Sequence, residues 1–223
     1  MKTSSSRRIK KPWPTKATME QIYRAKLWGD NGKEFYSGDG SHHPELVGPY
    51  VESIQSFLKS FKNPLTVIDL GCGDFNVGMK LVECAKQYIG VDIVEDLIQF
   101  NQNKFQNPNL EFHCLDIAKD PLPKADCVIL RQVLQHLSNS EIISVLNKLY
   151  DYKYVILTEH VPLENFTPNL DIISGQGTRL KHHSGVNICK APFLFNPKEV
   201  KQLLTLNSIN YGGQLVTTLF TMF

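Results

Sequence analysis

Glycines and acidic residues gather where a short apolar run ends, in the sequence DLGCGD at residues 69–74. Glycines at such a point let the backbone turn sharply and let a ligand approach it closely. A dinucleotide-binding turn needs a third glycine in the pattern G-x-G-x-x-G, but Gly78 comes two residues too late for that pattern. A pyrophosphate would also lie near Asp69 and Asp74, and two like charges about 5 Å apart repel by roughly 3 kcal/mol at an effective dielectric of 20. The turn is therefore expected to disfavour phosphate and to attract a cationic ligand.

Two more acidic residues follow the next apolar runs and extend this pattern. Asp92 lies 19 residues after Gly73, where a carboxylate can accept hydrogen bonds from both hydroxyls of a ribose. Asp116 ends the next run and is followed by Ile117, a pair that could bind the amino group of an adenine and cover its face. Because the acids at the glycine turn would attract an ammonium and a sulfonium group, the whole set indicates S-adenosylmethionine as the ligand.

Three residues are candidates for a catalytic base, because open α/β sheets bind ligands at the carboxyl ends of their strands. His136 follows the fourth apolar run, and Glu159 and His160 end the fifth. S-adenosylmethionine is a methyl donor, and methyl transfer needs a base only if the group that accepts the methyl is a hydroxyl or a protonated amine. Two alternatives stay open: His136 could merely hydrogen-bond the start of the next helix, and Glu159 and His160 could form a solvated strand end.

The loop at residues 166–190 is locally basic and is expected to contact the acceptor. Arg179 and His183 are its candidate substrate-binding residues, and their charge suggests an acceptor with a phosphate or carboxylate group. The alternative is a solvated basic loop. The adjacent histidines at 42–43 and 182–183 do not predict a metal site, since neighbours on an extended backbone point to opposite faces and no carboxylate or cysteine is suitably spaced.

Alternating strand and helix patterns position these residues. We expect strands at 65–70, 88–92, 110–116, 126–130, 154–159 and 214–222, and helices at 20–28, 45–61, 77–87, 94–105, 140–150 and 195–206. Short, continuous apolar strands that are buried on both faces predict a mostly parallel sheet covered by helices on both sides. The first two helices form a helical N-terminal cap.

Charge and composition narrow the class of protein. Six positive charges precede the first acidic residue, Glu20, and the remaining chain has 18 basic against 22 acidic residues. We therefore expect a mobile basic leader on an acidic body, without the basic patch of a nucleic-acid-binding domain. The 223 residues contain no apolar stretch near the roughly 20 residues that cross a membrane, and the five cysteines are scattered, which favours a cytoplasmic protein with reduced thiols.

Four segments resemble the motifs of class I S-adenosylmethionine-dependent methyltransferases. VIDLGCGDFNVG at 67–78 resembles the first motif and IGVDIVEDLI at 89–98 the second, while CLDIAKDPLP at 114–123 and DCVILRQVLQHLSNSEI at 126–142 resemble the third and fourth. Their order and spacing also match. The YSGDGS segment at 36–41 is similar to a turn that closes over the cofactor in members acting on small molecules or glycans.

The resemblance implies a Rossmann-like, seven-stranded, mostly parallel sheet with an antiparallel final strand. From the resemblance together with the charge and helix patterns, we expect a leader at 1–19, a cap or lid at 20–62 and a methyltransferase core at 63–223. The resemblance also implies S-adenosyl-L-methionine as cofactor. The residues expected to bind it are Ser37, Gly38, Ser41, Asp69, Gly71, Cys72, Gly73, Asp92, Ile93, Asp116, Ile117, Arg131 and Gln132.

The predicted function is methyl transfer to a small-molecule or sugar-like acceptor, with the basic loop favouring an anionic one. One alternative is an RNA or protein methyltransferase that docks through the basic leader, although LRQV at 130–133 stands where an Asn-Pro-Pro-Tyr amine-methylation motif would be. Another is a binding module that keeps the cofactor site without turnover. A nicotinamide-dependent oxidoreductase is disfavoured by the missing third glycine.

Overall fold

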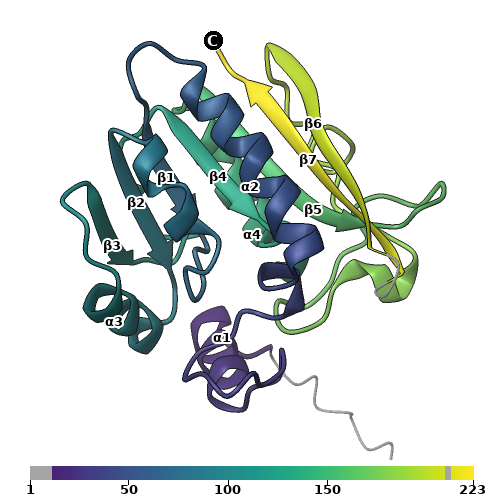
Figure 1. Ribbon diagram of the computed structural model, residues 1–223. Helices are drawn as coiled ribbons and strands as arrows, with labels where there is room; N and C mark the ends of the chain where they lie inside the picture. Colours follow the sequence, from purple (N-terminus) through teal and green to yellow (C-terminus); the bar gives the residue numbers. More distant parts are fainter. Residues whose placement is uncertain (1–11, 209–211) are drawn as a thin grey trace, which may run out of the picture.

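A seven-stranded sheet forms the centre of the computed structural model, which describes residues 12–208 and 212–223 (Figure 1). The strand order is β3-β2-β1-β4-β5-β7-β6, and β7 runs antiparallel to both of its neighbours. The strands are β1 (Thr66–Leu70), β2 (Gln87–Asp92), β3 (Leu110–Cys114), β4 (Cys127–Arg131), β5 (Tyr154–Val161), β6 (Glu199–Ser208) and β7 (Gly213–Thr221). This confirms the predicted Rossmann-like fold with its antiparallel final strand.

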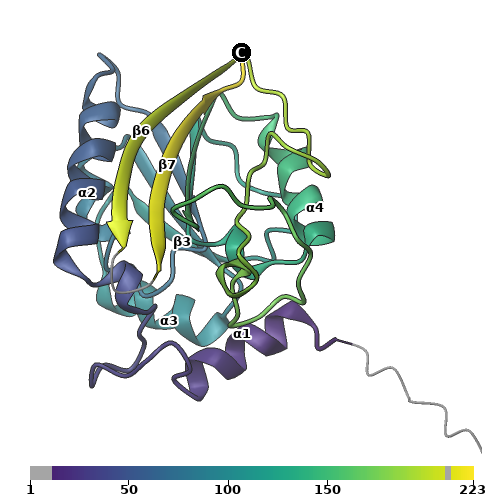
Figure 2. The ribbon, with the colours of Figure 1, turned by 90° about the vertical axis from the view of Figure 1, so that its right-hand side faces the viewer.

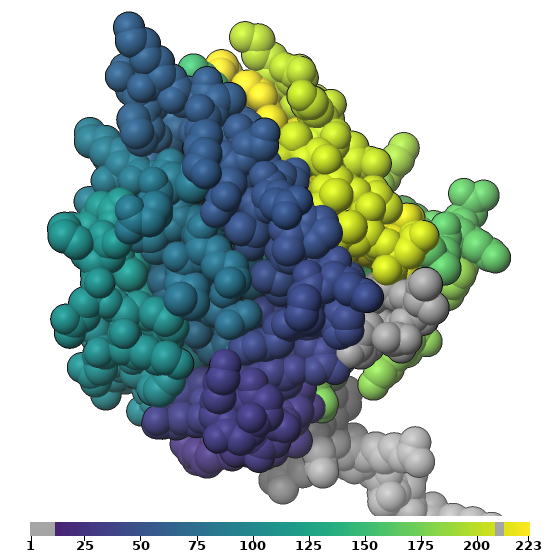
Figure 3. Space-filling model, in the orientation of Figure 1, coloured from purple at the N-terminus to yellow at the C-terminus, as the bar shows by residue number. Residues whose placement is uncertain are grey.

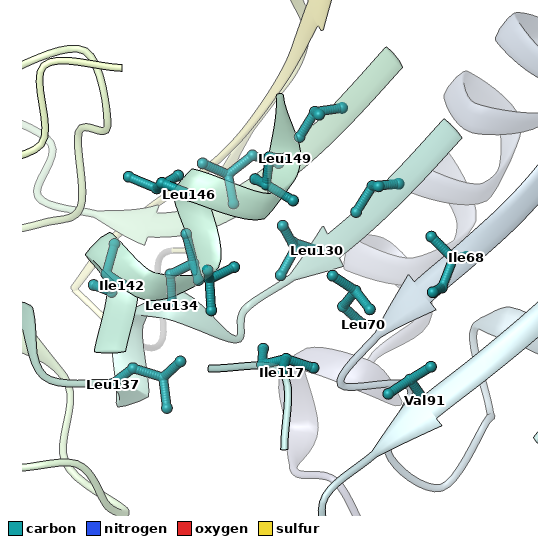
Figure 4. Close-up of a cluster of buried hydrophobic side chains, with 14 of the residues drawn as sticks. Ile68, Leu70, Val91, Ile117, Leu130, Leu134, Leu137, Ile142, Leu146 and Leu149 are labelled. Carbon is teal, nitrogen blue, oxygen red and sulfur yellow. The ribbon is translucent and has the colours of Figure 1, made fainter. Parts of the chain in front are cut away.

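Helices cover both faces of the sheet, as the two perpendicular views in Figures 1 and 2 show. They are α1 (Thr15–Arg24), α2 (Pro44–Lys59), α3 (Glu95–Lys104) and α4 (Asn139–Leu149). Ile54 and Leu58 of α2 pack against Ile129 on one face. On the other face, Ile142 of α4 belongs to a cluster with Leu130 that Figure 4 shows in close-up. Burial of these apolar side chains holds the three layers together.

The predicted helix at 77–87 is wrong, because this segment forms two short 3-10 turns, η2 (Gly78–Lys80) and η3 (Val82–Cys84). Phe75 takes a left-handed conformation (φ 60°) and is fully buried. A Cβ at Gly78 would lie 2.4 Å from the Phe75 ring. Met79 N donates to Phe75 O, but the next bonds are of the 3-10 type, from Lys80 N to Val77 O and from Leu81 N to Gly78 O. Ala85 is extended before β2, so the segment forms short 3-10 turns and no α-helix.

The predicted helix at 195–206 is also wrong, because these residues contain most of the edge strand β6. A β-bulge between Gln202 and Leu204 shifts the alternation of side chains by one residue. The apolar residues Val200, Leu203 and Leu204 therefore show helical spacing in a segment that pairs with β7 along its length. Pairing within the sheet overrides the local helical pattern.

The N-terminal cap starts earlier than predicted. Helix α1 begins at Thr15, not at Glu20, and Met19 and Ile22 are buried. Residues 1–11 of the predicted basic leader lie outside the described residues. On the face shown in Figure 3, the purple N-terminal segment lies next to the blue segment that contains α2 and the teal segment that contains α3, and Lys16 of α1 forms an ion pair with Glu95 of α3. None of the described helices combines the length and the apolar character needed to cross a membrane.

Candidate active site

A cavity of about 500 Å³ lies at the carboxyl ends of β1, β2 and β4. All thirteen residues that the sequence predicts for cofactor binding line it. They come from the cap (Ser37, Gly38, Ser41), the glycine turn (Asp69, Gly71, Cys72, Gly73) and the ends of the following strands (Asp92, Ile93, Asp116, Ile117, Arg131, Gln132). The fold therefore brings the separate motifs together around one space.

Two glycines of the turn are required by their surroundings. Gly71 and Gly73 have positive φ angles of 78° and 56°. A Cβ at Gly71 would lie 2.5 Å from a methyl group of Val133, and one at Gly73 would lie 2.4 Å from Ser37 Oγ. Only glycine fits both the backbone conformation and the space. The turn thus presents bare backbone to a ligand.

Three buried carboxylates surround this turn. Asp92 accepts hydrogen bonds from Gly73 N and Val94 N, each at 3.1 Å, and burial raises its pKa to about 6. Asp69 accepts from the Tyr88 hydroxyl at 2.9 Å, and burial raises its pKa to about 7. Asp74 is equally buried. Because each ionised carboxylate offers about four acceptor sites, lone pairs remain for ribose hydroxyls and an ammonium group. This set of acceptors fits S-adenosylmethionine, whose ribose hydroxyls and ammonium group donate.

The predicted adenine site is a narrow loop after β3. Asp116 accepts from Ala118 N at 3.0 Å and from Lys119 Nζ at 2.7 Å, and Ile117 belongs to the buried core. Lys148 Nζ donates to the carbonyl oxygens of Ile117 (2.9 Å) and Asp120 (2.6 Å). Helix α4 therefore fixes the loop that would face the adenine.

The Gly/Ser segment of the cap lies directly against the glycine turn. Ser37 Oγ accepts from Asp74 N at 2.8 Å, and Ser37 N donates to Asp74 Oδ2 at 3.1 Å. His42 Nε2 lies 2.5 Å from the same carboxylate oxygen. On the other side, Arg131 donates to Gly40 O at 2.6 Å and to Ser41 Oγ at 3.2 Å. The segment thus connects the glycine turn with the end of β4.

His136 is held in one neutral form at the other end of the cavity. Its Nδ1 lies 3.1 Å from Gly175 O, which can only accept, so Nδ1 carries the proton. Its Nε2 lies 3.2 Å from Gln135 Nε2, which donates, and Gln135 Oε1 accepts from His160 N at 3.2 Å. Burial lowers the pKa of His136 to about 4. The ring of Trp28 packs against it at 5.2 Å between centroids.

His160 also lines the cavity, from β5 opposite Leu215 of β7. Its side chain is 9% exposed, and its Nε2 is buried without a hydrogen-bond partner. Burial lowers its pKa, which keeps the imidazole neutral and able to accept a proton. The structure therefore places both candidate histidines at one end of the cavity.

The structure corrects the prediction that Glu159 is catalytic. Glu159 is 3% exposed and does not line the cavity. Its two oxygens accept from Leu134 N at 3.1 Å and from Gln135 N at 2.9 Å. Glu159 and His160 are adjacent on β5, and neighbouring side chains of a strand point to opposite faces of the sheet. His160 therefore lines the cavity, whereas Glu159 does not.

The predicted substrate-binding residues are corrected too. Arg179 is 1% exposed, and its five N–H donors bind carbonyl oxygens of the protein and the side chain of Asn139. His183 is exposed, lies outside the cavity, and contacts Asn165 O at 3.1 Å. Lys181, between them, does line the cavity. The 3-10 turn η5 (Arg179–His182) sends successive side chains in different directions, which the sequence alone could not resolve.

Sequence reasoning missed the aromatic residues Tyr23 and Trp28, which line the cavity from α1 and the turn after it. The Tyr23 hydroxyl lies 3.0 Å from Ser37 Oγ. It also missed Gln135, which lines the cavity. In the sequence, Gln135 is marked only by its polar side chain and its place next to His136 in the fourth motif. Within residues 12–208 and 212–223, no group of three or more His, Cys, Asp or Glu side chains could hold a metal ion.

Comparison with known proteins places these motifs in a family. Residues 67–152 match the model of a methyltransferase domain. No curated protein matches the sequence. The structure is similar to the N-methyltransferase NodS from Bradyrhizobium japonicum WM9 in complex with S-adenosyl-L-homocysteine, with 12% identity over 92% of this chain and 98% of that chain and a TM-score of 0.65.

Two further solved structures share the fold. Magnesium protoporphyrin IX methyltransferase from Synechocystis PCC 6803, with bound S-adenosylhomocysteine, is 17% identical over 92% of this chain and 99% of that chain, with a TM-score of 0.61. Human N-acetylserotonin methyltransferase in complex with S-adenosylmethionine is 16% identical over 94% of this chain and 60% of that chain, with a TM-score of 0.58. The motifs, the methyltransferase-domain match over residues 67–152 and the fold agree in supporting an S-adenosylmethionine-dependent methyltransferase of class I.

Proposed function

We propose that this methyltransferase acts on a small molecule, which binds at the end of the cavity that holds His136 and His160. The observation that carries the proposal is the continuity of one cavity from the acids of the glycine turn to these two histidines. Helix α1 contributes Met19 and Tyr23 to the lining, so the cap encloses the space and leaves room for a compact acceptor. Two of the similar structures bear names of small-molecule acceptors, magnesium protoporphyrin IX and N-acetylserotonin.

At the glycine-turn end of the cavity, we assign residues to parts of the cofactor from their chemistry. Asp92 would bind the ribose hydroxyls, Asp69 and the glycine turn the methionyl group, and Asp116 with Ile117 the adenine. S-adenosylmethionine, when bound, supplies a methyl carbon made electrophilic by the adjacent sulfonium. The contribution of the protein is to hold the acceptor atom in line with that carbon, since positioning supplies much of the rate of such a displacement.

His160 is the general base of the proposal. The oxygens of Glu159 accept from backbone amides, and the lone pair of His136 Nε2 accepts from Gln135. His160 lines this end of the cavity and its imidazole is neutral. Its Nε2 has no partner and lies against β7 close to Gly213, so this nitrogen reaches an acceptor only when the ring turns toward the cavity. It would take the proton of an acceptor hydroxyl as the oxygen forms its bond to carbon. We therefore propose a hydroxyl-bearing acceptor.

Lys181 supports an anionic group on that acceptor. It lines the cavity and forms no ion pair with another described side chain. A carboxylate or phosphate on the acceptor would accept a charge-assisted hydrogen bond from its ammonium group. Neither Arg179 nor His183 of the basic loop at 166–190 lines the cavity. Lys181 is therefore the basic side chain of the loop that we propose to contact the acceptor.

Transfer of label tests the proposal. The protein is incubated with methyl-labelled S-adenosylmethionine and a fractionated metabolite extract, and the labelled product is identified by mass spectrometry. We expect label on a hydroxyl of a small anionic compound, at least 100-fold less product with His160→Ala, and a higher KM for the acceptor with Lys181→Gln. A protein that binds the cofactor but labels nothing would be a binding module, and label on RNA or protein instead would contradict the small-molecule acceptor.

A further inference from the structure

The turn after β4 is held from two sides by buried charges that do not touch the cavity. This turn, η4 (Leu134–His136) with Leu137, contains Gln135 and His136 and follows directly on Gln132 at the floor of the cavity. Gln132 itself has a left-handed backbone (φ 58°), so the chain bends sharply before the turn. The position of η4 determines where the acceptor end of the cavity lies.

Glu159 holds the amide side of the turn. Its carboxylate accepts from the backbone N–H groups of Leu134 and Gln135, one on each oxygen. An unpaired carboxylate at 3% exposure would be very costly, and these two bonds are what compensates its burial. The end of β5 is thereby tied to the start of the turn.

Arg179 holds the carbonyl side of the same turn. Its Nη1 donates to the carbonyl oxygens of Leu134 (3.2 Å) and Gln135 (3.3 Å), and its Nη2 donates to that of Leu137 (2.8 Å). The remaining donors bind Leu170 O and Asn139 Oδ1, both at 2.8 Å. The peptide groups of the turn thus lie between a buried carboxylate and a buried guanidinium, and each charge is satisfied through the backbone.

The side chain of Gln135 connects the turn to both histidines through hydrogen bonds. Its amide nitrogen donates to His136 Nε2 and its amide oxygen accepts from His160 N, both at 3.2 Å. A shift of the turn by about 1 Å would break the bond from His160 N to Gln135 and the bond of His136 Nδ1 to Gly175 O, because His160 and Gly175 lie outside the turn. Misplacement of that size can cost about 100-fold in rate. His136 would then lose Gly175 O, the acceptor that fixes the proton on Nδ1.

We propose that Glu159 and Arg179 are a pair of positioning residues, which fix η4 so that Gln135 holds His136 and His160 in a set relation at the acceptor end. The inference rests on the proposed function, because it takes these histidines as the groups that face the acceptor. Neither residue touches the acceptor itself, and both act through the backbone of the turn.

Nitrogen-15 spectra of the histidine side chains test this in the full chain, together with calorimetric binding of S-adenosylhomocysteine. In the wild type we expect His136 as a single neutral form protonated at Nδ1. In Glu159→Gln and Arg179→Lys we expect a mixture of forms at His136, with affinity for S-adenosylhomocysteine within threefold of wild type. Glu164→Gln and Arg24→Lys are matched exposed controls and should leave the spectra unchanged.

A second variant, Gln135→Leu, leaves Glu159 and Arg179 unchanged. It tests the role of the turn if Glu159→Gln and Arg179→Lys do not fold. It should shift the Nε2 resonance of His136, which loses its donor, and lower thermal stability because His160 N loses its acceptor. An unchanged His136 signature in folded Glu159→Gln, or in Gln135→Leu, would overturn the positioning role. Loss of S-adenosylhomocysteine binding in the wild type would instead contradict the proposed function, so the two failures can be told apart.

Discussion

The two ends of the cavity use buried charge in opposite ways. At the glycine turn, the carboxylates of Asp69 and Asp92 line the cavity and keep acceptor sites for a ligand. At η4, the buried charges of Glu159 and Arg179 lie behind the cavity wall and bind the backbone. The first end therefore binds by charge, whereas the second end is shaped by buried charge and presents two neutral histidines, with Lys181 as its one proposed charged contact. Substitutions at the two ends should separate affinity from stability.

The largest expected effect is on stability, in Arg179→Ala. Removal of the guanidinium leaves the carbonyl oxygens of Leu134, Gln135 and Leu137 without this buried donor, which costs about 3–5 kcal/mol. For a chain of this size that lowers Tm by about 10 °C. Thermal unfolding followed by circular dichroism measures the loss, with Arg24→Ala as the exposed control. A change of Tm below about 2 °C would refute the structural role of this charge.

The next effect is on cofactor affinity, in Asp92→Ala. We expect micromolar binding of S-adenosylmethionine in the wild type and about 100-fold weaker binding in the variant, because a buried charged acceptor of two ribose hydroxyls is lost, about 3 kcal/mol. Calorimetry gives both affinities, and Asp96→Ala, exposed on α3, is the matched control. Unchanged affinity in Asp92→Ala would remove the basis of the cofactor assignment.

The glycine turn could be predicted in full because its residues are adjacent in the sequence and their backbone needs are local. Gly71 and Gly73 require positive φ, and acids at the ends of consecutive strands necessarily meet at one edge of a parallel sheet. The acceptor end could not be predicted in the same way. Glu159 and Arg179 are both charged residues near the expected site, and only their partners 24 to 45 residues away show that they face inward.

The prediction of secondary structure from local patterns was limited in the same way. Strands β1 to β5 follow from continuous apolar runs, whereas β6 shows helical spacing because of its bulge and forms a strand only by pairing with β7. Tyr23 and Trp28 likewise reach the cavity through the packing of the cap, which no local pattern encodes. The glycine turn and the strand ends were predictable because the parallel sheet brings them together, whereas the segment at 77–87, β6 and the packing of the cap depend on contacts that the sequence does not show.

A third effect concerns pH and has opposite signs for affinity and stability. Burial raises the pKa of Asp69 to about 7 and that of Asp92 to about 6, above the ordinary value of 3.8. The folded protein without ligand therefore binds more protons than the unfolded chain, and the stability from these two groups is lost as pH rises from about 4 to 7. A cationic ligand needs the ionised form, so its affinity should rise over pH 5.5–7.5, by up to about tenfold per unit.

Calorimetry of S-adenosylmethionine in buffers of different ionisation enthalpy tests this linkage. Near pH 6.5 we expect release of about one proton on binding, and Asp69→Asn should release less. The unfolding free energy of the unliganded protein, measured in urea over the same pH range, should move in the other direction. Proton uptake on binding would contradict the electrostatic account of the glycine turn.

The smallest effect is expected in Ser37→Ala, which tests how the cap contributes to the first end. Ser37 Oγ accepts from Asp74 N at 2.8 Å and lies 3.0 Å from the Tyr23 hydroxyl, so it joins the cap to the glycine turn. Loss of one such hydrogen bond costs about 1 kcal/mol, which predicts dissociation of S-adenosylhomocysteine about fivefold faster in stopped-flow measurements. Ser60→Ala, at the exposed end of α2, should leave the rate unchanged. If Ser37→Ala leaves it unchanged as well, then the charge of the acids alone retains the cofactor, and the cap contributes only to the enclosure of the acceptor.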